Sequence, residues 1–249
     1  MQISLTVNGF SDLLEFPDQE IATIHTKLLD HFHEIYLKKG SPIIVFFAAP
    51  PATGKSTLAA LWEELAESYS DYPRLQSVSI DGFHYPNRYL LNHYLNDDEN
   101  QVLLKEIKGA PETYNTKALY ESLTQLKRRG TVTWPYYDRN IHDPVPDAVI
   151  LDAPIIVIEG NWLLLKEAGW EDLSSFADIT IFHEAEKEEL KDRLIQRKIR
   201  GGYSQTEAEA HVNSSDLPNI TRVLQHSGPA DIILSWDRMH QKRLLDFTL

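Results

Sequence analysis

Residues 43–57 read IIVFFAAPPATGKST, an apolar run followed by a proline-containing loop and then by Gly54-Lys55-Ser56. The run is continuously apolar, as is typical of a strand that is covered on both faces of a parallel sheet. The residues after Gly54 have the spacing of an amphipathic helix, which we predict over residues 55–69. A strand, a glycine-containing loop and a helix in this order direct backbone N–H groups and the positive end of a helix dipole at one point, an arrangement that binds phosphate.

The loop departs from the usual phosphate-binding pattern, G-x-x-x-x-G-K-[ST], because alanine stands at position 49. Glycine is needed where φ is positive, so Ala49 suits the site only if its own φ is negative. Pro50 and Pro51 restrict two neighbouring φ angles and would stiffen the loop. We therefore predict a working ATP site in which Lys55 reaches the terminal phosphates and Ser56 ligates Mg²⁺. The loop residues predicted to bind ATP are Ala52, Thr53, Gly54, Lys55, Ser56 and Thr57.

The composition limits the class of protein. The chain has 249 residues, enough for a domain with a substantial core, and no cysteine, which excludes disulfides and thiolate metal sites. Its formal net charge is -13, so we expect neither nucleic acid nor an anionic membrane as a partner. No apolar stretch approaches the roughly 20 residues that span a bilayer, and the N-terminus lacks the pattern of a secretion signal. We expect a soluble, cytoplasmic protein.

Further apolar runs alternate with helical patterns along the chain. MQISLTV followed by Asn8-Gly9 predicts an N-terminal hairpin, and residues 21–39 predict a helix that leads into the core. Short apolar runs end near Asp81, Glu159, Phe182 and Leu234, which predicts a parallel sheet with helices on both faces. Helices are also predicted over residues 100–108, 116–129, 187–200 and 206–214, the last starting at a capping box of Thr206 and Glu209. We expect one α/β domain over residues 1–249, with residues 1–40 leading into its core.

Two acids stand where predicted strands end. Asp81 follows SVSI and Glu159 follows IIVI. Ligands of open α/β sheets bind outside the carboxyl ends of the strands, so both acids are expected to face the cleft beside the Gly54 loop. We predict that Asp81 is the general base for an acceptor hydroxyl and that Glu159 positions Mg²⁺. The alternative for each is an acid that caps the following turn.

Four motifs follow the loop in order: DGFHYPN (residues 81–87), KGAPETYN (108–115), VTWPYYDR (132–139) and VIEGNWLLL (157–165). This series resembles the P-loop kinases of the pantothenate kinase, uridine kinase and phosphoribulokinase group, strongly over residues 43–165 and more loosely to about residue 234. The resemblance implies a P-loop NTPase-type sheet with a helical lid and insertions. It also implies transfer of the γ-phosphate of ATP to a hydroxyl of a small metabolite.

By that resemblance Asp81 corresponds to the acid on the acceptor side. The residues expected near the acceptor are His84, Tyr85, Asn87, Tyr137, Asp138, Arg139 and Asn161. Arg139 presents several fixed donors and suits an anionic or hydroxyl-rich substrate. His84 fits equally well as a hydrogen-bonded turn histidine. Lys108 and Glu112 are as well explained by helix capping, and a contact of Asn219 with adenine is a weak extension of the resemblance.

Three arginines share one face of the predicted helix over residues 187–200. Arg193, Arg197 and Arg200 lie at positions i, i+4 and i+7, and Gly201-Gly202 follow. Such a series suits a lid that closes over ATP and stabilises charge on the γ-phosphate, with Arg197 as the catalytic member. The alternative is surface ion pairing, which Glu189 makes credible for Arg193.

The sequence therefore predicts an ATP- and Mg²⁺-dependent kinase acting on a pantothenate-, nucleoside- or sugar-like metabolite. Two alternatives stay open: a nucleoside triphosphatase without a small-molecule acceptor, and a nucleotide-binding protein that lacks turnover. The acceptor and the oligomeric state are open as well, a homodimer included.

Overall fold

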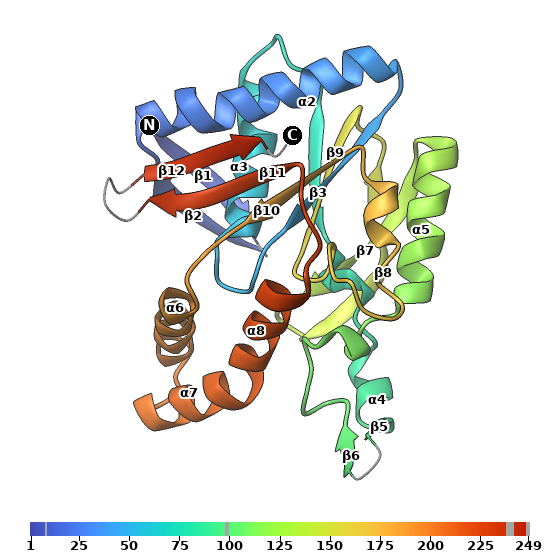
Figure 1. Cartoon of the computed structure of the whole chain (residues 1–249), viewed down its shortest axis with the longest axis vertical. Helices are drawn as coiled ribbons and strands as arrows, with labels where there is room; N and C mark the ends of the chain where they lie inside the picture. Colours follow the sequence, from blue (N-terminus) through green and yellow to red (C-terminus); the bar gives the residue numbers. More distant parts are fainter. Residues whose placement is uncertain (8, 98–99, 238–241, 248–249) are drawn as a thin grey trace.

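The computed structural model describes residues 1–7, 9–97, 100–237 and 242–247. Its central sheet has six strands in the order β12-β11-β10-β3-β9-β4. The parallel strands are β3 (Ile43–Ala48), β4 (Leu75–Ser79), β9 (Ile155–Gly160), β10 (Ile179–His183) and β11 (Ile232–Asp237). At one edge β12 (Lys242–Phe247) pairs antiparallel with β11. The predicted α/β fold with a parallel sheet is confirmed (Figure 1).

Helices cover both faces of this sheet, which is why its strands are continuously apolar. Val45 and Phe47 of β3 pack in one core cluster with α2 (Thr26–Lys39) and α3 (Lys55–Ser68). Ile44 and Phe46 point to the other face and pack in a second cluster with α5 (Thr116–Arg129). Every residue of β3 is buried, so a charge anywhere along this strand would be costly.

The N-terminal segment folds as predicted. β1 (Gln2–Val7) and β2 (Phe10–Glu15) form an antiparallel hairpin, whose Ile3 and Leu5 are buried against α3 and its neighbours. The chain then runs through α1 (Asp18–Glu20), a π-helical turn (Ile21–His25) and α2. Gly40, with a φ of 66°, ends α2 in the left-handed conformation that glycine adopts at little cost.

In the described residues, the segment between β4 and β9 contains two helices, two 3₁₀ turns and two hairpins. These are a 3₁₀ turn (Ile80–Phe83), α4 (Asn87–Leu90), the hairpin of β5 (Tyr94–Asp97) and β6 (Asn100–Leu103), a 3₁₀ turn (Pro111–Thr113), α5, and the hairpin of β7 (Val132–Asp138) and β8 (Asp143–Leu151).

The predicted helix over residues 100–108 is wrong. Its first residues, Asn100–Leu103, form β6, and turns follow. The backbone hydrogen bonds run across the chain, because the Leu104 N–H donates to the His93 carbonyl and the Lys105 N–H to that of Leu90. These tertiary bonds replace the i to i−4 bonds that a helix would need.

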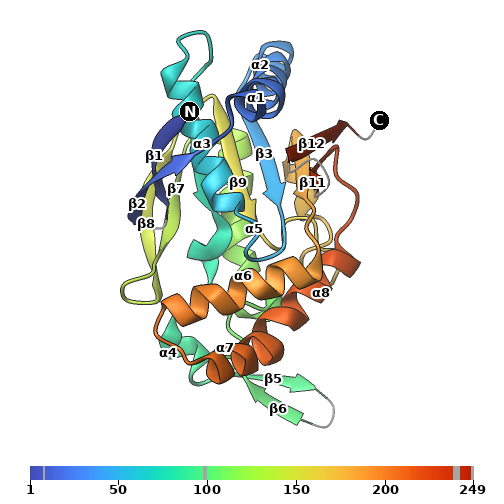
Figure 2. The ribbon, with the colours of Figure 1, turned by 90° about the vertical axis from the view of Figure 1, so that its left-hand side faces the viewer.

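Three helices lie together beyond the carboxyl end of β3 (Figure 2). They are α6 (Lys187–Arg200), α7 (Gln205–His211) and, after a π-helical turn (Val212–Asp216), α8 (Leu217–His226). Leu190, Leu194, Ala208, Val212 and Ile220 form a small core of their own here. We call these helices the lid helices, since α6 carries the three arginines predicted to form a lid.

The capping box of α7 lies two residues before the predicted one. The Ser204 hydroxyl accepts from the Glu207 N–H at 3.3 Å, and the Glu207 carboxylate accepts from the Ser204 N–H at 2.9 Å. Thr206 instead lies inside the first turn, because the extended backbone that a cap residue requires is found at Ser204. Among the residues that the structure describes, no helix is both long and apolar enough to cross a lipid bilayer.

Candidate active site

The loop between β3 and α3 has the backbone that the glycine pattern requires. Gly54 has a φ of 91°, in the left-handed region. Ala49 is buried and is not among the residues with positive φ, so the condition for alanine at this position is met. Ala52 takes a φ of 67°, which costs a non-glycine residue roughly 1–2 kcal/mol. The Thr53 hydroxyl donates to the Pro50 carbonyl at 3.1 Å and ties the loop back on itself.

The side chains of Lys55 and Ser56, at the start of α3, meet that of Glu159 from β9. The Ser56 hydroxyl donates to Glu159 Oε1 at 2.8 Å, and Lys55 Nζ lies 3.8 Å from Glu159 Oε2. Burial raises the pKa of the Glu159 carboxyl, although Lys55 and the Ser56 and Ser79 hydroxyls oppose the shift. Glu159 Oε2 is buried without a hydrogen-bond partner in the described structure. A buried carboxylate oxygen in this state is a natural contact for a cation or its water shell.

The donor set fits Mg²⁺. A hydroxyl and a carboxylate are hard oxygen donors, and Mg²⁺ bound with nucleotide phosphates usually takes only one or two protein ligands. The described ranges contain no group of three or more His, Cys, Asp or Glu side chains that could hold a metal without such help. Ser56 and Glu159 are therefore the residues that would hold Mg²⁺ here, directly or through water.

Asp81 lies in the 3₁₀ turn after β4, within a network of donors. Tyr114 Oη donates to its Oδ1 at 3.1 Å, and Arg139 Nη2 donates to its Oδ2 at 3.1 Å. Burial would raise the pKa of Asp81, but the positive charges around it and the Tyr114 hydroxyl lower it overall. The largest of these opposing contributions comes from His84, followed by Arg139 and Lys55, while burial lowers the pKa of His84 itself. Asp81 is thus ionised and held in place.

Of the other residues of DGFHYPN, His84 lies beside Asp81, while Tyr85 and Asn87 contact neighbouring parts of the protein. His84 is buried, its Nδ1 lies 2.8 Å from the Asp81 carbonyl oxygen, and its ring packs on Tyr114 at a centroid distance of 3.9 Å. The Tyr85 ring stacks on Tyr89 at 4.3 Å. Asn87 is at the start of α4, where its side chain and N–H are used in hydrogen bonds within the protein. Of these residues, His84 is the one that contacts Asp81 directly.

The β7 hairpin brings a second group to Asp81. Tyr137 lies 5.4 Å from His84 between ring centroids, and burial raises its pKa to about 12. Arg139 forms the ion pair with Asp81 described above. Asn161, which follows β9, has a buried Oδ1 without a hydrogen-bond partner in the described structure. Their roles in acceptor binding stay predictions.

Arg193 of α6 contacts the phosphate loop. Its Nη1 donates to the Ala52 carbonyl at 3.3 Å, and its Nη2 pairs with Glu189, as the ion-pair alternative anticipated. The first contact crosses from the lid helices to the loop, and a role for Arg193 in ATP binding stays a prediction.

Arg197 lies one turn further along α6. Its side chain is accessible, yet surrounding protein desolvates it and lowers its pKa against the attraction of Asp216. The charges of Asp81 and Arg139 also act on the pKa of Arg197, whose catalytic role stays a prediction. Arg200 is exposed at the end of the helix, and its charge also acts on Arg197.

A cavity lies between the first turns of α3 and the two acids. It has a volume of about 260 Å³, and its walls include Ser56, Asp81, Tyr137 and Glu159. Pockets for drug-sized ligands measure about 300–1,000 Å³, so this cavity suits a small molecule. The carboxylate of Asp81 and the start of α3 therefore open onto one shared space, as the positions of the acids at strand ends predicted.

Comparisons with known proteins agree with this geometry. The model of the phosphoribulokinase / uridine kinase family matches residues 44–233. The chain belongs to this family. Within the family group, the uncharacterized protein YggC of Escherichia coli (strain K12) is 42% identical over 94% of this chain and 95% of its own. A pantothenate kinase of Psychromonas ingrahamii is 29% identical over 91% of this chain and 69% of its own.

Solved structures support the same family fold. A protein of Silicibacter sp. TM1040, whose proposed role is that of a fructose transport system kinase, has a TM-score of 0.72 and 27% sequence identity. The similarity covers 84% of this chain and 98% of that one. The family membership carries with it P-loop nucleotide binding and kinase chemistry.

One wall of the cavity lies outside the family match. Thr6 and Val7 of β1 line the cavity together with Tyr136, and a Cβ on Gly9 would lie 3.6 Å from the Tyr136 hydroxyl. The N-terminal hairpin precedes residue 44, where the family match begins. The N-terminal hairpin therefore contributes part of the cavity wall.

Sequence reasoning missed Tyr114 and interpreted Lys108 as equally well explained by helix capping. Tyr114 contacts the Asp81 carboxylate, yet KGAPETYN was not expected to place it there. Lys108 lies with its Nζ 5.0 Å from the centroid of the Tyr137 ring, and burial lowers its pKa to about 8. The order of the motifs carried a signal, since both residues belong to a motif that the resemblance identified, but the spacing alone does not place them beside Asp81.

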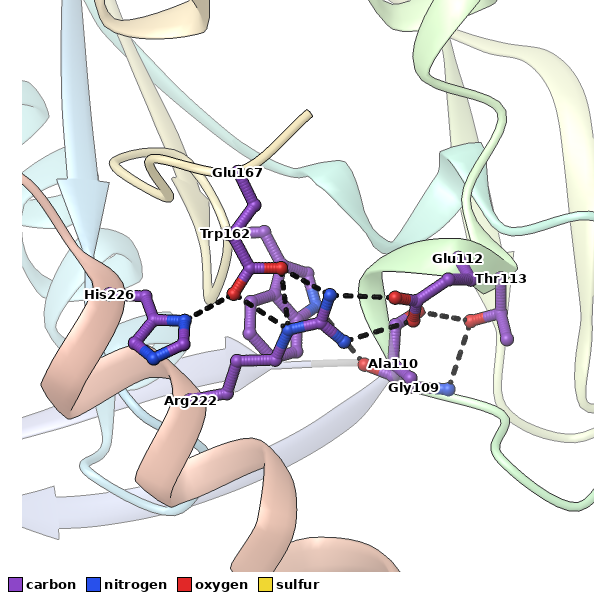
Figure 3. Close-up of polar contacts among 8 residues, drawn as sticks. All are labelled: Gly109, Ala110, Glu112, Thr113, Trp162, Glu167, Arg222 and His226. Carbon is purple, nitrogen blue, oxygen red and sulfur yellow. Dashed lines mark hydrogen bonds and ion pairs between the residues drawn. The ribbon is translucent and has the colours of Figure 1, made fainter. Parts of the chain in front are cut away.

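An ion-pair cluster links the segment KGAPETYN (residues 108–115) to the lid helices (Figure 3). Arg222 of α8 donates to Glu112 Oε1 at 2.6 Å and, through Nε, to Glu167 Oε2 at 2.9 Å. His226 also pairs with Glu167. Because Glu112 lies two residues before Tyr114, the cluster connects the base of the lid helices to the acceptor side of the site.

Proposed function

We propose that this protein is an ATP- and Mg²⁺-dependent kinase that transfers the γ-phosphate to a hydroxyl of a small metabolite. The observation that carries the proposal is the shared cavity, in which the start of α3 and the Asp81 carboxylate face one space of about 260 Å³. A site for nucleotide alone would not need an ionised, hydrogen-bonded acid across from its phosphate loop.

The reaction is an in-line displacement. The acceptor oxygen attacks the γ-phosphorus, its proton passes to Asp81, and ADP leaves. Tyr114 and Arg139 hold the two Asp81 oxygens, so the base is oriented before the acceptor arrives. Lys55 and Arg197 stabilise negative charge on the transferred group. Mg²⁺, when bound, supplies further neutralisation of the phosphates.

Ionisation of Asp81 at neutral pH suits this role. Because its pKa is lowered, the carboxylate is in the proton-accepting form throughout the physiological range. It is a weak base in the ground state, and it accepts the proton as the acceptor oxygen gains bonding to phosphorus.

The related pantothenate kinase suggests a pantothenate-like acceptor, while nucleoside- and sugar-like acceptors are candidates from the wider family. The test is ADP release by the full chain with Mg-ATP, measured across pantothenate, nucleosides, sugars and glycerate. We expect one class of metabolite to stimulate ADP release strongly.

Two outcomes would contradict the proposal. ADP release that no metabolite stimulates would indicate a nucleoside triphosphatase. ATP binding by calorimetry without ADP release in the presence of any acceptor would indicate a nucleotide-binding protein without turnover.

A further inference from the structure

Two lysines beside the acceptor side of the site share a single uncharged oxygen. Lys105 Nζ and Lys108 Nζ donate to Asn87 Oδ1 at 2.7 and 2.8 Å. Lys108 Nζ also donates to the His142 carbonyl oxygen at 2.8 Å. Both side chains are half-buried, and neither forms an ion pair with a carboxylate in the part of the chain that the structure describes. Two ammonium groups therefore meet at neutral acceptors, where their charges repel.

These lysines belong to the same site as Asp81. Lys108 Nζ is 5.0 Å from the centroid of the Tyr137 ring, and the Arg139 guanidinium carbon is 5.8 Å from the same centroid. Tyr137 and Asp81 both line the acceptor cavity. Lys108 is also close enough to Asp81 for that carboxylate to act on its ionisation. Two cations, Lys108 and Arg139, thus lie close to the ring of Tyr137, a residue of the cavity wall.

Two of the described acids act on the charge of Lys108, in a chain whose net charge is -13. They are Asp143 and Asp81. Asp81 is paired with Arg139, and Asp143 acts on Lys108 without a direct ion pair. Burial, followed by repulsion from Lys105, lowers the pKa of Lys108 to about 8. An anion in contact with Lys108 would favour its charged form and oppose this lowering of its pKa.

Building on the proposed kinase function, we infer that the acceptor carries an anionic group, a carboxylate or a phosphate ester, that binds Lys108 and Lys105 while its hydroxyl faces Asp81. Lys108 uses two of its three N–H donors and Lys105 uses one, so both have donors left for a ligand. Charge-assisted hydrogen bonds to a carboxylate or phosphate would be stronger than the present ones to neutral oxygens. An uncharged nucleoside or sugar would leave the lysines without a counter-charge.

The experiment compares acceptors that differ only in charge. ADP release by the full chain with Mg-ATP is measured with D-glycerate against glycerol, pantothenate against pantothenol, and ribose 5-phosphate against ribose. We expect kcat/KM to favour the charged member of at least one pair by roughly 10- to 100-fold, the range of a hydrogen bond to a charged group. The first two pairs test a carboxylate and the third tests a phosphate ester.

Lys108→Gln keeps a polar side chain of similar length and removes the charge. We expect it to lower kcat/KM for the charged acceptor by a similar factor and to reduce the preference over the neutral member. Lys127→Gln is the matched control. Lys127 is on α5, is not among the cavity residues, and donates to the Ser175 carbonyl at 2.9 Å. Lys105→Gln serves as a second variant if Lys108→Gln does not fold.

The outcomes separate the two proposals. A higher kcat/KM for the neutral members, or an unchanged preference in both lysine variants, would overturn the anionic acceptor and leave the kinase function standing. Turnover with none of the acceptors would count against the kinase function. Anion binding by the lysines would then be tested by thermal unfolding with saturating Mg-ADP, with and without added inorganic phosphate. A phosphate-dependent rise in Tm that is lost in Lys108→Gln would support it, and equal shifts in both proteins would refute it.

Discussion

Replacing Asp81 by asparagine tests the proposed general base while preserving the shape of the site. The amide oxygen of the new side chain can still accept from Tyr114, whose hydroxyl now donates at 3.1 Å. Its NH₂ group would face Arg139 Nη2, which now donates to Asp81 at 3.1 Å, so two donors would oppose each other. The change removes the negative charge and the proton acceptor without opening a cavity.

The expected effects on stability and on activity differ greatly. The side chains of Arg139 and Asp81 are 40% and 27% exposed, so solvent screens their ion pair and its loss costs less than about 1 kcal/mol. For a chain of this length that corresponds to a fall in Tm of less than about 4 °C. Loss of a general base lowers kcat by roughly 10²- to 10⁴-fold, or about 3–5 kcal/mol in the barrier. ATP affinity should change little, because Asp81 lies on the acceptor side.

The assay combines three measurements: ADP release with the best acceptor, ATP binding by calorimetry, and thermal unfolding. Asp152→Asn is the matched control, because Asp152 pairs with Arg74 at 2.6 Å in a more exposed position away from the cavity. It should show a similarly small change in Tm and full activity. If Asp81→Asn kept more than about a tenth of the wild-type kcat, or lost ATP affinity as much as turnover, the assignment of the base would be wrong.

Three further perturbations follow from the geometry. Glu159→Gln should raise the Mg²⁺ concentration needed for half-maximal ADP release by roughly 10- to 100-fold, and an unchanged Mg²⁺ titration would contradict its role. Because Lys108 is cationic below a pKa of about 8, kcat/KM for an anionic acceptor should fall as the pH rises through about 8. In Lys108→Arg this fall in kcat/KM should move above the measured pH range. A fall that persists near pH 8 would assign the titration to another group. Arg222→Met leaves Glu112 and Glu167 without their shared cation, so urea denaturation should show a loss of roughly 1–3 kcal/mol, and an unchanged midpoint would show that the cluster is not stabilising.

Local patterns predicted much of the framework. The buried strands, the glycine at position 54 and the three arginines on one helix face each depend on neighbours within a few residues, so sequence spacing captures them. The helices over residues 116–129 and 187–200 have the predicted bounds. By contrast, residues 100–108 lack helical structure because their hydrogen bonds go to distant backbone groups.

The sequence by itself determined that this chain forms a parallel sheet with a phosphate loop and acids at strand ends, since apolar runs and turn residues act over short distances. Only the tertiary structure decided which side chains meet. Ser56 and Glu159 are 103 positions apart and touch because β9 lies next to β3 in the sheet. Tyr114 reaches Asp81 from 33 positions away. Strand order and loop packing set such contacts, and these depend on the whole core rather than on any one segment.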